Sequence, residues 1–413
     1  MSLPPRLIVA DPGLRNALGH HLGYSLAVAT AAAARGIEPL VLASRDFTGG
    51  LPGGLPCRPS FGALYQSAGG GGAARRALFG LAAQLPRPIA ACVAPPLRLL
   101  RRALRRPAPD GFAAELAAAL TASGDSSGDL VLLHSASAAN LAGLVAALPA
   151  DGLGALAIVL RRTPAEMDRD DAGPQPVAEI LAGVAGYFGR RLRLLADTAP
   201  LARLWTAALG RTVREVPLPV VAPPVRTAPP GQPPHLVFAG GARAEKGYGL
   251  LPALVGRLAG QARFSIHSGP IGPADDPLVQ RAHRHLRALA GPDMVLLERA
   301  LPPDDYLALL HAADLLLLPY DATAYGPRSS GILAEARAMG VPAVVPGGCW
   351  MADAVGPDGG LVFHDSRKFV ATVEQALPRL PALLTAYADA ADSWRATHSP
   401  DGVLQRLLEV NPS

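Results

Sequence analysis

Short apolar runs recur along this chain, and longer stretches with amphipathic spacing separate them. Apolar runs bounded by glycine, proline or charged residues predict buried strands, and the stretches between them predict helices. This alternation occurs on both sides of a proline-rich segment and predicts two parallel sheets with crossover helices. The predicted strands are Arg6–Asp11, Glu38–Ser44, Leu130–His134 and Ala155–Leu160, then His235–Ala239, Arg263–His267, Met294–Leu297, Leu315–Pro319 and Pro342–Val345.

The proline-rich segment, residues 216–234, divides the chain. Proline lacks a backbone N–H and fixes its own backbone angle, so such a segment forms neither a helix nor a central strand and predicts a stiff linker. A chain of 413 residues is long enough for two domains. We predict an N-terminal α/β domain over 1–215, a C-terminal α/β domain over 235–375, and C-terminal helices over 376–413.

The composition is that of a well-buried globular protein, with 50% apolar and 17% charged residues, and it excludes a disordered chain. The cysteines Cys57, Cys92 and Cys349 are widely spaced and predict neither a disulfide framework nor a metal site. We expect the start of the sequence not to be a signal peptide, and no apolar run reaches the length of a membrane span. The expected location is the cytoplasm.

The formal net charge of +5 fits acidic ligands or an anionic membrane. Arginines in residues 75–106 bracket apolar residues such as Leu78 and Phe79. This segment either rests peripherally on the inner face of a membrane or forms arginine-capped surface helices broken by prolines. The sequence contains no aromatic-studded basic cluster, so nucleic acid is not an expected partner.

The first chemical signal is the segment 239–248, which follows a predicted strand. Gly240 and Gly241 allow a tight turn, and Arg243 and Lys246 lie at its mouth. Of the 38 lysine and arginine residues, only Lys246 and Lys368 are lysines. A lysine kept in so arginine-rich a chain indicates a need for a compact ammonium group, although a solvated surface lysine is the alternative.

The second signal is the turn of Arg328, Ser329, Ser330 and Gly331, which precedes an apolar helix. Free N–H groups and the helix dipole at such a start favour a phosphate. Glu335 lies about one helical turn further on, where a carboxylate could bind sugar hydroxyls. The alternative is an ordinary capped crossover helix.

Together with the run from Ala312 to Tyr320, these segments resemble the donor half of GT-B glycosyltransferases of the retaining family 4 type, over roughly residues 233–363. The resemblance implies the GT-B fold, with two Rossmann-like domains whose parallel sheets face a central cleft. It also implies that the C-terminal helices cross back onto the N-terminal domain. It also implies transfer of a sugar, with retention, from a nucleotide-diphosphate sugar to an acceptor hydroxyl. The acceptor would be a saccharide or lipid-linked, as in polysaccharide or glycoconjugate synthesis. No essential metal or other cofactor is implied.

By the same resemblance, Arg243 and Lys246 would neutralise the donor diphosphate, the amides of Ser330 and Gly331 would bind it, and Glu335 would hold the ribose. Many family members carry a Glu-x7-Glu pattern, but Pro327 stands where the first glutamate is expected. Some bacterial members have the Tyr-x-x-Arg-Ser-Ser-Gly turn found here, in which Arg328 would share the charge stabilisation. A sugar-nucleotide epimerase of the same fold and a non-catalytic nucleotide-sugar-binding protein are the alternatives.

Four residues of the first half are further candidates. Gly19 ends a loop that resembles the glycine-rich turn near the donor phosphates, with a plain strand-to-helix turn as the alternative. His134 follows a buried strand, so we expect its side chain to point out of the core toward the cleft, for a catalytic role or as a backbone cap. Arg161 and Arg162 also follow a strand and would bind an anionic acceptor.

Overall fold

The computed structural model describes residues 3–16, 19–62, 111–170, 175–273, 275–356 and 360–409. The arginine-rich segment 75–106 lies outside the described residues, and so do both interpretations of it. By its contacts the chain forms two units. Unit 1 consists of Met1–Ala17, His21–Val216 and Leu404–Ser413, and unit 2 consists of Leu18–His20 and Pro217–Val403.

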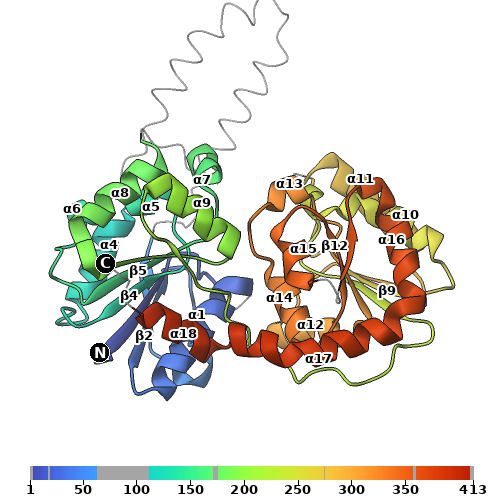
Figure 1. The fold of residues 1–413 in the computed structure, drawn as a ribbon, viewed down its shortest axis with the longest axis horizontal. Coiled ribbons are helices and arrows are strands. Elements are labelled where there is room, and N and C mark those ends of the chain that lie inside the picture. Colours follow the sequence, from blue (N-terminus) through green and yellow to red (C-terminus); the bar gives the residue numbers. More distant parts are fainter. Residues whose placement is uncertain are drawn as a thin grey trace, which may run out of the picture. The chain divides into compact units, whose positions relative to one another are not determined.

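The described part of unit 1 contains a seven-stranded parallel sheet in the order β3-β2-β1-β4-β5-β6-β7 (Figure 1). Its strands are β1 (Arg6–Asp11), β2 (Glu38–Ser44), β3 (Cys57–Phe61), β4 (Leu130–Leu133), β5 (Ala155–Leu160), β6 (Leu192–Ala196) and β7 (Arg214–Glu215). Its helices are α1 (Gly19–Ala34), α4 (Phe112–Thr121), α5 (Ala138–Ala142), α6 (Leu144–Ala147), α7 (Pro164–Asp170), α8 (Val177–Phe188) and α9 (Ala199–Leu209).

The described part of unit 2 contains a six-stranded parallel sheet in the order β10-β9-β8-β11-β12-β13. Its strands are β8 (His235–Phe238), β9 (Arg263–His267), β10 (Met294–Leu297), β11 (Leu315–Leu317), β12 (Ala343–Pro346) and β13 (Gly360–Phe363). Its α-helices are α10 (Leu251–Arg257), α11 (Pro277–Leu289), α12 (Pro303–His311), α13 (Ala322–Tyr325), α14 (Gly331–Ala338), α15 (Trp350–Val355), α16 (Phe369–Ala376) and α17 (Leu380–His398). The predicted pair of parallel α/β sheets is confirmed.

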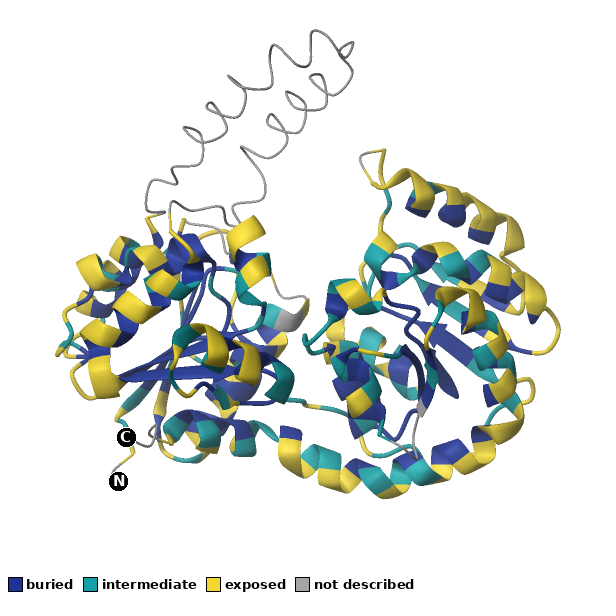
Figure 2. Ribbon diagram, turned by 45° about the horizontal axis from the view of Figure 1, so that its top comes forward, coloured by how far each residue is buried: buried dark blue, intermediate teal, exposed yellow. Residues whose placement is uncertain are grey.

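Each sheet is buried between its helices, which expose their outer faces (Figure 2). Parallel strands covered on both faces must be apolar throughout, and β5, with the sequence Ala-Leu-Ala-Ile-Val-Leu, is buried at every position. The same rule explains why apolar runs located most of the central strands. No helix among the described residues is long and apolar enough to cross a membrane.

The proline-rich segment carries no helix or strand and is bonded to unit 2. Arg226 forms an ion pair of 2.5 Å with the buried Asp314 and donates to the Ala313 carbonyl. Arg395 of α17 donates to the Pro223 carbonyl at 2.7 Å. These bonds fix the segment along unit 2, so its position is set by arginine hydrogen bonds as well as by proline stiffness.

Helix α17 packs against α14 through a sandwich of side chains. The Arg337 guanidinium of α14 lies 4.9 Å from the ring centroids of both Tyr387 and Trp394. The Trp394 indole N–H also donates to the Ala334 carbonyl at 3.0 Å. Helix α14 is therefore held from behind by residues much later in the sequence.

The last described helix, α18 (Pro400–Leu408), ends within unit 1. The Arg193 guanidinium, at the start of β6, donates to the Leu407 carbonyl. Arg214 of β7 forms an ion pair of 2.7 Å with Glu409. Leu407 and Glu409 are therefore bonded to β6 and β7 of the first sheet, although they follow all of unit 2 in the sequence.

Candidate functional site

The glycine turn after β8 brings the two sequence motifs into contact. Gly240 and Gly241 have φ angles of 99° and 79°, which side chains other than glycine rarely adopt. A Cβ atom on Gly240 would lie 2.3 Å from Cδ1 of Ile332 in α14 and 2.8 Å from Nζ of Lys246. The missing side chain therefore makes room for both neighbours at the carboxyl end of β8.

Lys246 is buried, with 6% of its surface exposed, and is not a solvated surface lysine. Its ammonium group donates to the Gly240 carbonyl and lies 5.7 Å from the centroid of the Tyr320 ring. Burial and, to a smaller extent, the positive charge of the nearby Arg243 together lower the pKa of Lys246 to about 7. The group is thus a desolvated cation with little counter-charge, which favours an anionic ligand.

Two arginines lie around the same point. Arg328 lies over the Tyr325 ring at 5.4 Å, and Arg243 pairs at 3.3 Å with the partly exposed Glu245. Burial raises the pKa of Tyr325, while the positive charges of Arg243 and Arg328 oppose that rise. Both guanidinium groups therefore lie close enough to Tyr325 to lower its pKa. Both also lower the pKa of Lys246.

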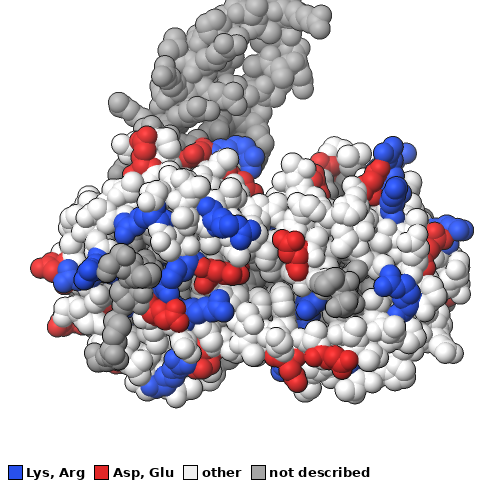
Figure 3. All heavy atoms as spheres, viewed as in Figure 1, with Lys and Arg blue, Asp and Glu red and all other residues white. Residues whose placement is uncertain are grey.

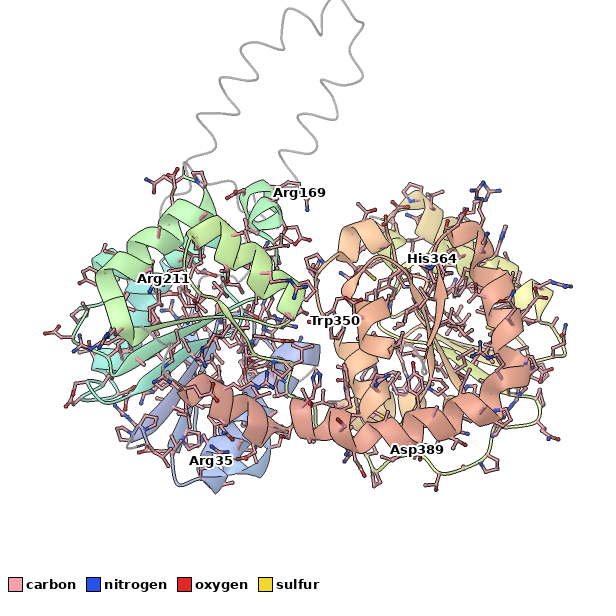
Figure 4. The ribbon with its side chains drawn as sticks, viewed as in Figure 1. Arg35, Arg169, Arg211, Trp350, His364 and Asp389 are labelled. Atoms are coloured by element: carbon pink, nitrogen blue, oxygen red, sulfur yellow. The ribbon has the colours of Figure 1, made fainter. Side chains whose placement is uncertain are left out.

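Helix α14 begins at Gly331, as the sequence predicts. The Ser330 hydroxyl caps it by accepting from the Leu333 N–H at 3.4 Å, and Ser330 is buried while Gly331 is exposed. Ser329 is half-buried. The backbone N–H of Trp350, at the start of α15 (Figure 4), donates to the Gly326 carbonyl at 2.8 Å. Hydrogen bonds therefore fix the turn before the helix both at Gly326 and at Ser330.

Glu335 is partly buried on α14, and its carboxylate accepts from the Tyr306 hydroxyl of α12 at 2.7 Å. Burial raises the pKa of Glu335 to about 7, and the Tyr306 hydrogen bond opposes only part of that rise. Near neutral pH the carboxyl group therefore exists in both forms. Either form can accept a hydrogen bond from a hydroxyl group.

Glu335→Gln is expected to stabilise the protein increasingly between pH 4.5 and 7, by up to roughly 3 kcal/mol in the free energy of unfolding. Over that range the unfolded chain loses the Glu335 proton while the folded protein keeps it, so folding becomes costlier as the pH rises. Glutamine carries no charge and removes this cost. Denaturant unfolding of both proteins at pH 5, 6, 7 and 8 measures the difference, and a difference independent of pH would contradict the shifted pKa.

Gly19 begins α1 with a φ angle of 77°, which explains a glycine there. His134 follows β4 as predicted but is fully buried. Its Nδ1 lies 3.2 Å from the Ser135 hydroxyl, and its ring stacks on Tyr24 at 4.2 Å. The expectation that this side chain points out of the core is wrong, because neighbouring side chains enclose the ring.

His134 instead belongs to a polar cluster around Asp11 at the end of β1. The buried Asp11 carboxylate lies 3.0 Å from His134 Nε2, 2.8 Å from His21 Nδ1 and 3.1 Å from the Ser25 hydroxyl. Burial alone would raise the pKa of Asp11, but the two imidazoles hold it well below its usual range. Burial lowers the pKa of His134, and Asp11 offsets part of that effect.

The two arginines predicted to bind an acceptor are engaged within the protein. Arg161 pairs with Asp197 at 3.2 Å, and the Arg161 side chain is 17% exposed. Arg162 is buried, and its backbone carbonyl accepts from the Trp205 indole at 2.9 Å. Arg162 therefore does not project into solvent toward an acceptor.

Three residues of these clusters were assigned no role from the sequence: Tyr306, Asp11 and His21. Asp11 ends a predicted strand. His21 and Ser25, in the helix that follows, are four residues apart and so lie on the same helix face. This pattern could have indicated a polar cluster. Tyr306 carried no comparable signal, because it lies 29 residues before Glu335 on another helix.

A cavity of about 1120 Å³ lies in unit 2 next to the loop that carries Lys246, since Ala244 and Gly247 line it. It is lined by residues of α10 and α11 and by the loops after β11, β12 and β13, including Leu250, Leu278, Tyr320 and His364. Lys246, Arg328 and Glu335 do not line it, but Tyr320, which lies 5.7 Å from the Lys246 ammonium group, does. This largely apolar cavity therefore borders the cation cluster and does not contain it. On the face in Figure 3, basic and acidic side chains of the described residues are interspersed.

No protein-family model and no curated protein matches the sequence. Solved structures do match over nearly the whole chain. HepE from Anabaena in complex with UDP has a TM-score of 0.63 at 12% identity, covering 97% of this chain and 98% of that one. Sucrose-phosphate synthase from Thermosynechococcus elongatus has 0.60 at 12%, covering 97% of each chain. The trehalose-6-phosphate synthase OtsA has 0.63 at 14%, covering 99% and 100%. These matches show that the chain has the GT-B fold.

Proposed function

We propose that this protein is a glycosyltransferase that moves a sugar from a nucleotide-diphosphate sugar to an acceptor hydroxyl, with retention, as family 4 enzymes do. The observation that carries the proposal is the gathering of Lys246, Arg243 and Arg328 beside the start of α14, at the carboxyl end of the unit 2 sheet. Ligands of open parallel sheets bind at that end. HepE, which has the same fold, binds UDP and UDP-glucose, so a UDP-sugar is the first donor to test.

The cations would act on the leaving group. Breaking the bond to the sugar leaves a diphosphate whose charge grows in the transition state, and fixed positive charge there lowers the barrier. Lys246 would supply a desolvated charge, while Arg243 and Arg328 would close around the phosphates. The start of α14, with Ser329, Ser330 and Gly331, would add backbone N–H groups. This arrangement would neutralise the diphosphate without a metal ion.

Glu335 would hold the ribose. Its carboxyl group lies on α14 one turn beyond Gly331 and is oriented by Tyr306. Ribose hydroxyls would donate to it, next to the phosphates bound at the helix start. For the acceptor we propose a saccharide, free or lipid-linked, in cytoplasmic polysaccharide or glycoconjugate synthesis.

UDP-glucose is expected to bind more weakly as the pH rises above about 7. Free Lys246 has a pKa of about 7, whereas a bound diphosphate would keep it charged, so binding above that pH must take up a proton. The association constant should be nearly constant well below pH 7 and fall by up to about tenfold per pH unit above it. Calorimetric titration from pH 6 to 9 measures this slope. Lys246→Met should remove it, and an unchanged slope in that variant would contradict the assignment.

A donor panel tests the function as a whole. The protein is incubated with UDP-, GDP- and ADP-sugars without acceptor, and release of nucleoside diphosphate is measured by chromatography. Slow hydrolysis of one donor is the expected result. Conversion of one nucleotide sugar into another would instead identify an epimerase of the same fold. Binding without any turnover, with or without mixed saccharide acceptors, would favour a nucleotide-sugar-binding protein, for which the proline at position 327 gives a reason.

A further inference from the structure

Three side chains of the kinds that bind transition metals converge at the carboxyl edge of the unit 1 sheet. Asp11 ends β1, His21 lies in the first turns of α1, and His134 follows β4. Each offers one ligand atom, and these atoms all lie within 4.8 Å of one another. Ligand atoms of one zinc ion, each about 2.0 to 2.2 Å from the metal, are separated by distances below this limit.

The two imidazoles face the same carboxylate from two sides. Nδ1 of His21 lies 2.8 Å from Oδ1 of Asp11, and Nε2 of His134 lies 3.0 Å from Oδ2. Asp11 and His134 have no exposed side-chain surface, whereas the His21 side chain is 15% exposed. The cluster is therefore enclosed on the side of the sheet and reaches solvent through His21.

Neighbouring groups hold these side chains in place. The Ser135 hydroxyl lies 3.2 Å from Nδ1 of His134, the nitrogen that faces away from Asp11. The Gly13 N–H donates to Oδ1 of Asp11 at 3.0 Å, and a Cβ atom on Gly13 would lie 2.1 Å from the His21 ring. A hydrogen bond to the distal nitrogen of a histidine and one to the carboxylate are the outer contacts that metal ligands usually have.

We propose that Asp11, His21 and His134 bind one zinc ion. Two neutral imidazoles and one carboxylate form a donor set suited to zinc and leave a fourth position open. The Ser25 hydroxyl, 3.1 Å from Asp11 Oδ2 and 3.0 Å from His134 Nε2, lies beside that position and would bind the metal or a metal-bound water. The ion would replace the protons otherwise shared between the carboxylate and the imidazoles. It would tie β1, α1 and β4 together, and the inference does not rest on sugar transfer.

The test uses the full-length chain without a polyhistidine tag, stripped of metal with a chelator. Cobalt is titrated first, because four-coordinate Co²⁺ gives a strong visible absorption, and zinc is then added to displace it. The expected result is saturation at one cobalt per chain and loss of the absorption with zinc. His21→Ala should weaken zinc binding by more than about 100-fold, because loss of an outer contact alone costs about 10- to 100-fold. His21 is the ligand at the surface, so this variant should keep its fold.

His285→Ala is the matched control, since His285 is exposed on α11 and belongs to the other unit. Zinc should raise the midpoint of thermal unfolding of the wild type and of His285→Ala but not of His21→Ala, whose circular dichroism should match the wild type. A cluster held only by hydrogen bonds would give no stoichiometric cobalt absorption. That result, or equal zinc affinity in His21→Ala, overturns the proposal, and neither measurement depends on a sugar donor.

Discussion

Lys246→Met is expected to lower kcat for donor cleavage by about 100- to 1000-fold, the loss typical of removing one preorganised group that stabilises transition-state charge. Methionine keeps most of the buried side-chain volume between Gly240 and Tyr320 but carries no charge. The departing diphosphate would then lose its least solvated cation. Steady-state kinetics with the donor identified in the panel measure the effect, and KM is expected to rise less than kcat falls.

Lys368→Met is the matched control for this prediction. Lys368 is the other lysine of the chain and is exposed at the end of a short 3₁₀ helix, Ser366–Lys368. The same substitution there should leave kcat unchanged. Wild-type kinetics in Lys246→Met would exclude this lysine from the leaving-group site, and equal losses in both variants would point to a general effect of charge.

Gly247→Ala is expected to lower the free energy of unfolding by about 3 kcal/mol or more, or to prevent folding of unit 2. Gly247 has a φ angle of 67°, and a Cβ atom there would lie 1.8 Å from the Pro319 carbonyl oxygen. The loop that carries Arg243 and Lys246 would have to separate from the end of β11. The midpoint of thermal unfolding, followed by circular dichroism, gives the size of the effect.

The matched control is Gly249→Ala, two residues further on. A Cβ atom at Gly249 would meet no atom within 4 Å, and its φ angle is not in the left-handed region. This variant should unfold close to the wild-type temperature, since it has neither the positive φ angle nor the close contact of Gly247. Equal midpoints for all three proteins would show that the loop can shift at little energetic cost. That result would contradict the expected clash with the Pro319 carbonyl.

The central strands could be predicted because burial on both faces leaves a continuous apolar run. The bounds predicted for β1, β2, β5 and β9 match those of the structure, and so do those of the edge strand β10. The pattern missed edge strands such as β3, whose sequence Cys-Arg-Pro-Ser-Phe is mostly polar, and β13, which begins with a glycine. It also missed the buried interior strand β6, whose apolar run is interrupted by Arg193. An edge strand has one neighbour and more solvent, so its sequence is less constrained.

The site was predicted as far as it is local in sequence. The turn at Gly240 and the helix start at Gly331 each lie within one segment, and their proximity follows from the parallel sheet. The partner of Glu335 was not predictable, since Tyr306 reaches it from another helix. The burial of His134 was not predictable either, because Asp11 and Tyr24, which enclose it, come from a different strand and helix.

The packing of α14 against α17 determines when some native contacts can form during synthesis on the ribosome. Arg337 emerges long before Tyr387 and Trp394, the two rings that cover it. The hydrogen bond from Arg193 of the first sheet forms later still, because its acceptor, the Leu407 carbonyl, follows unit 2 in the sequence. Neither contact can form before its later partner has been made, so a nascent chain stalled before residue 380 would expose the back of α14 to chaperones.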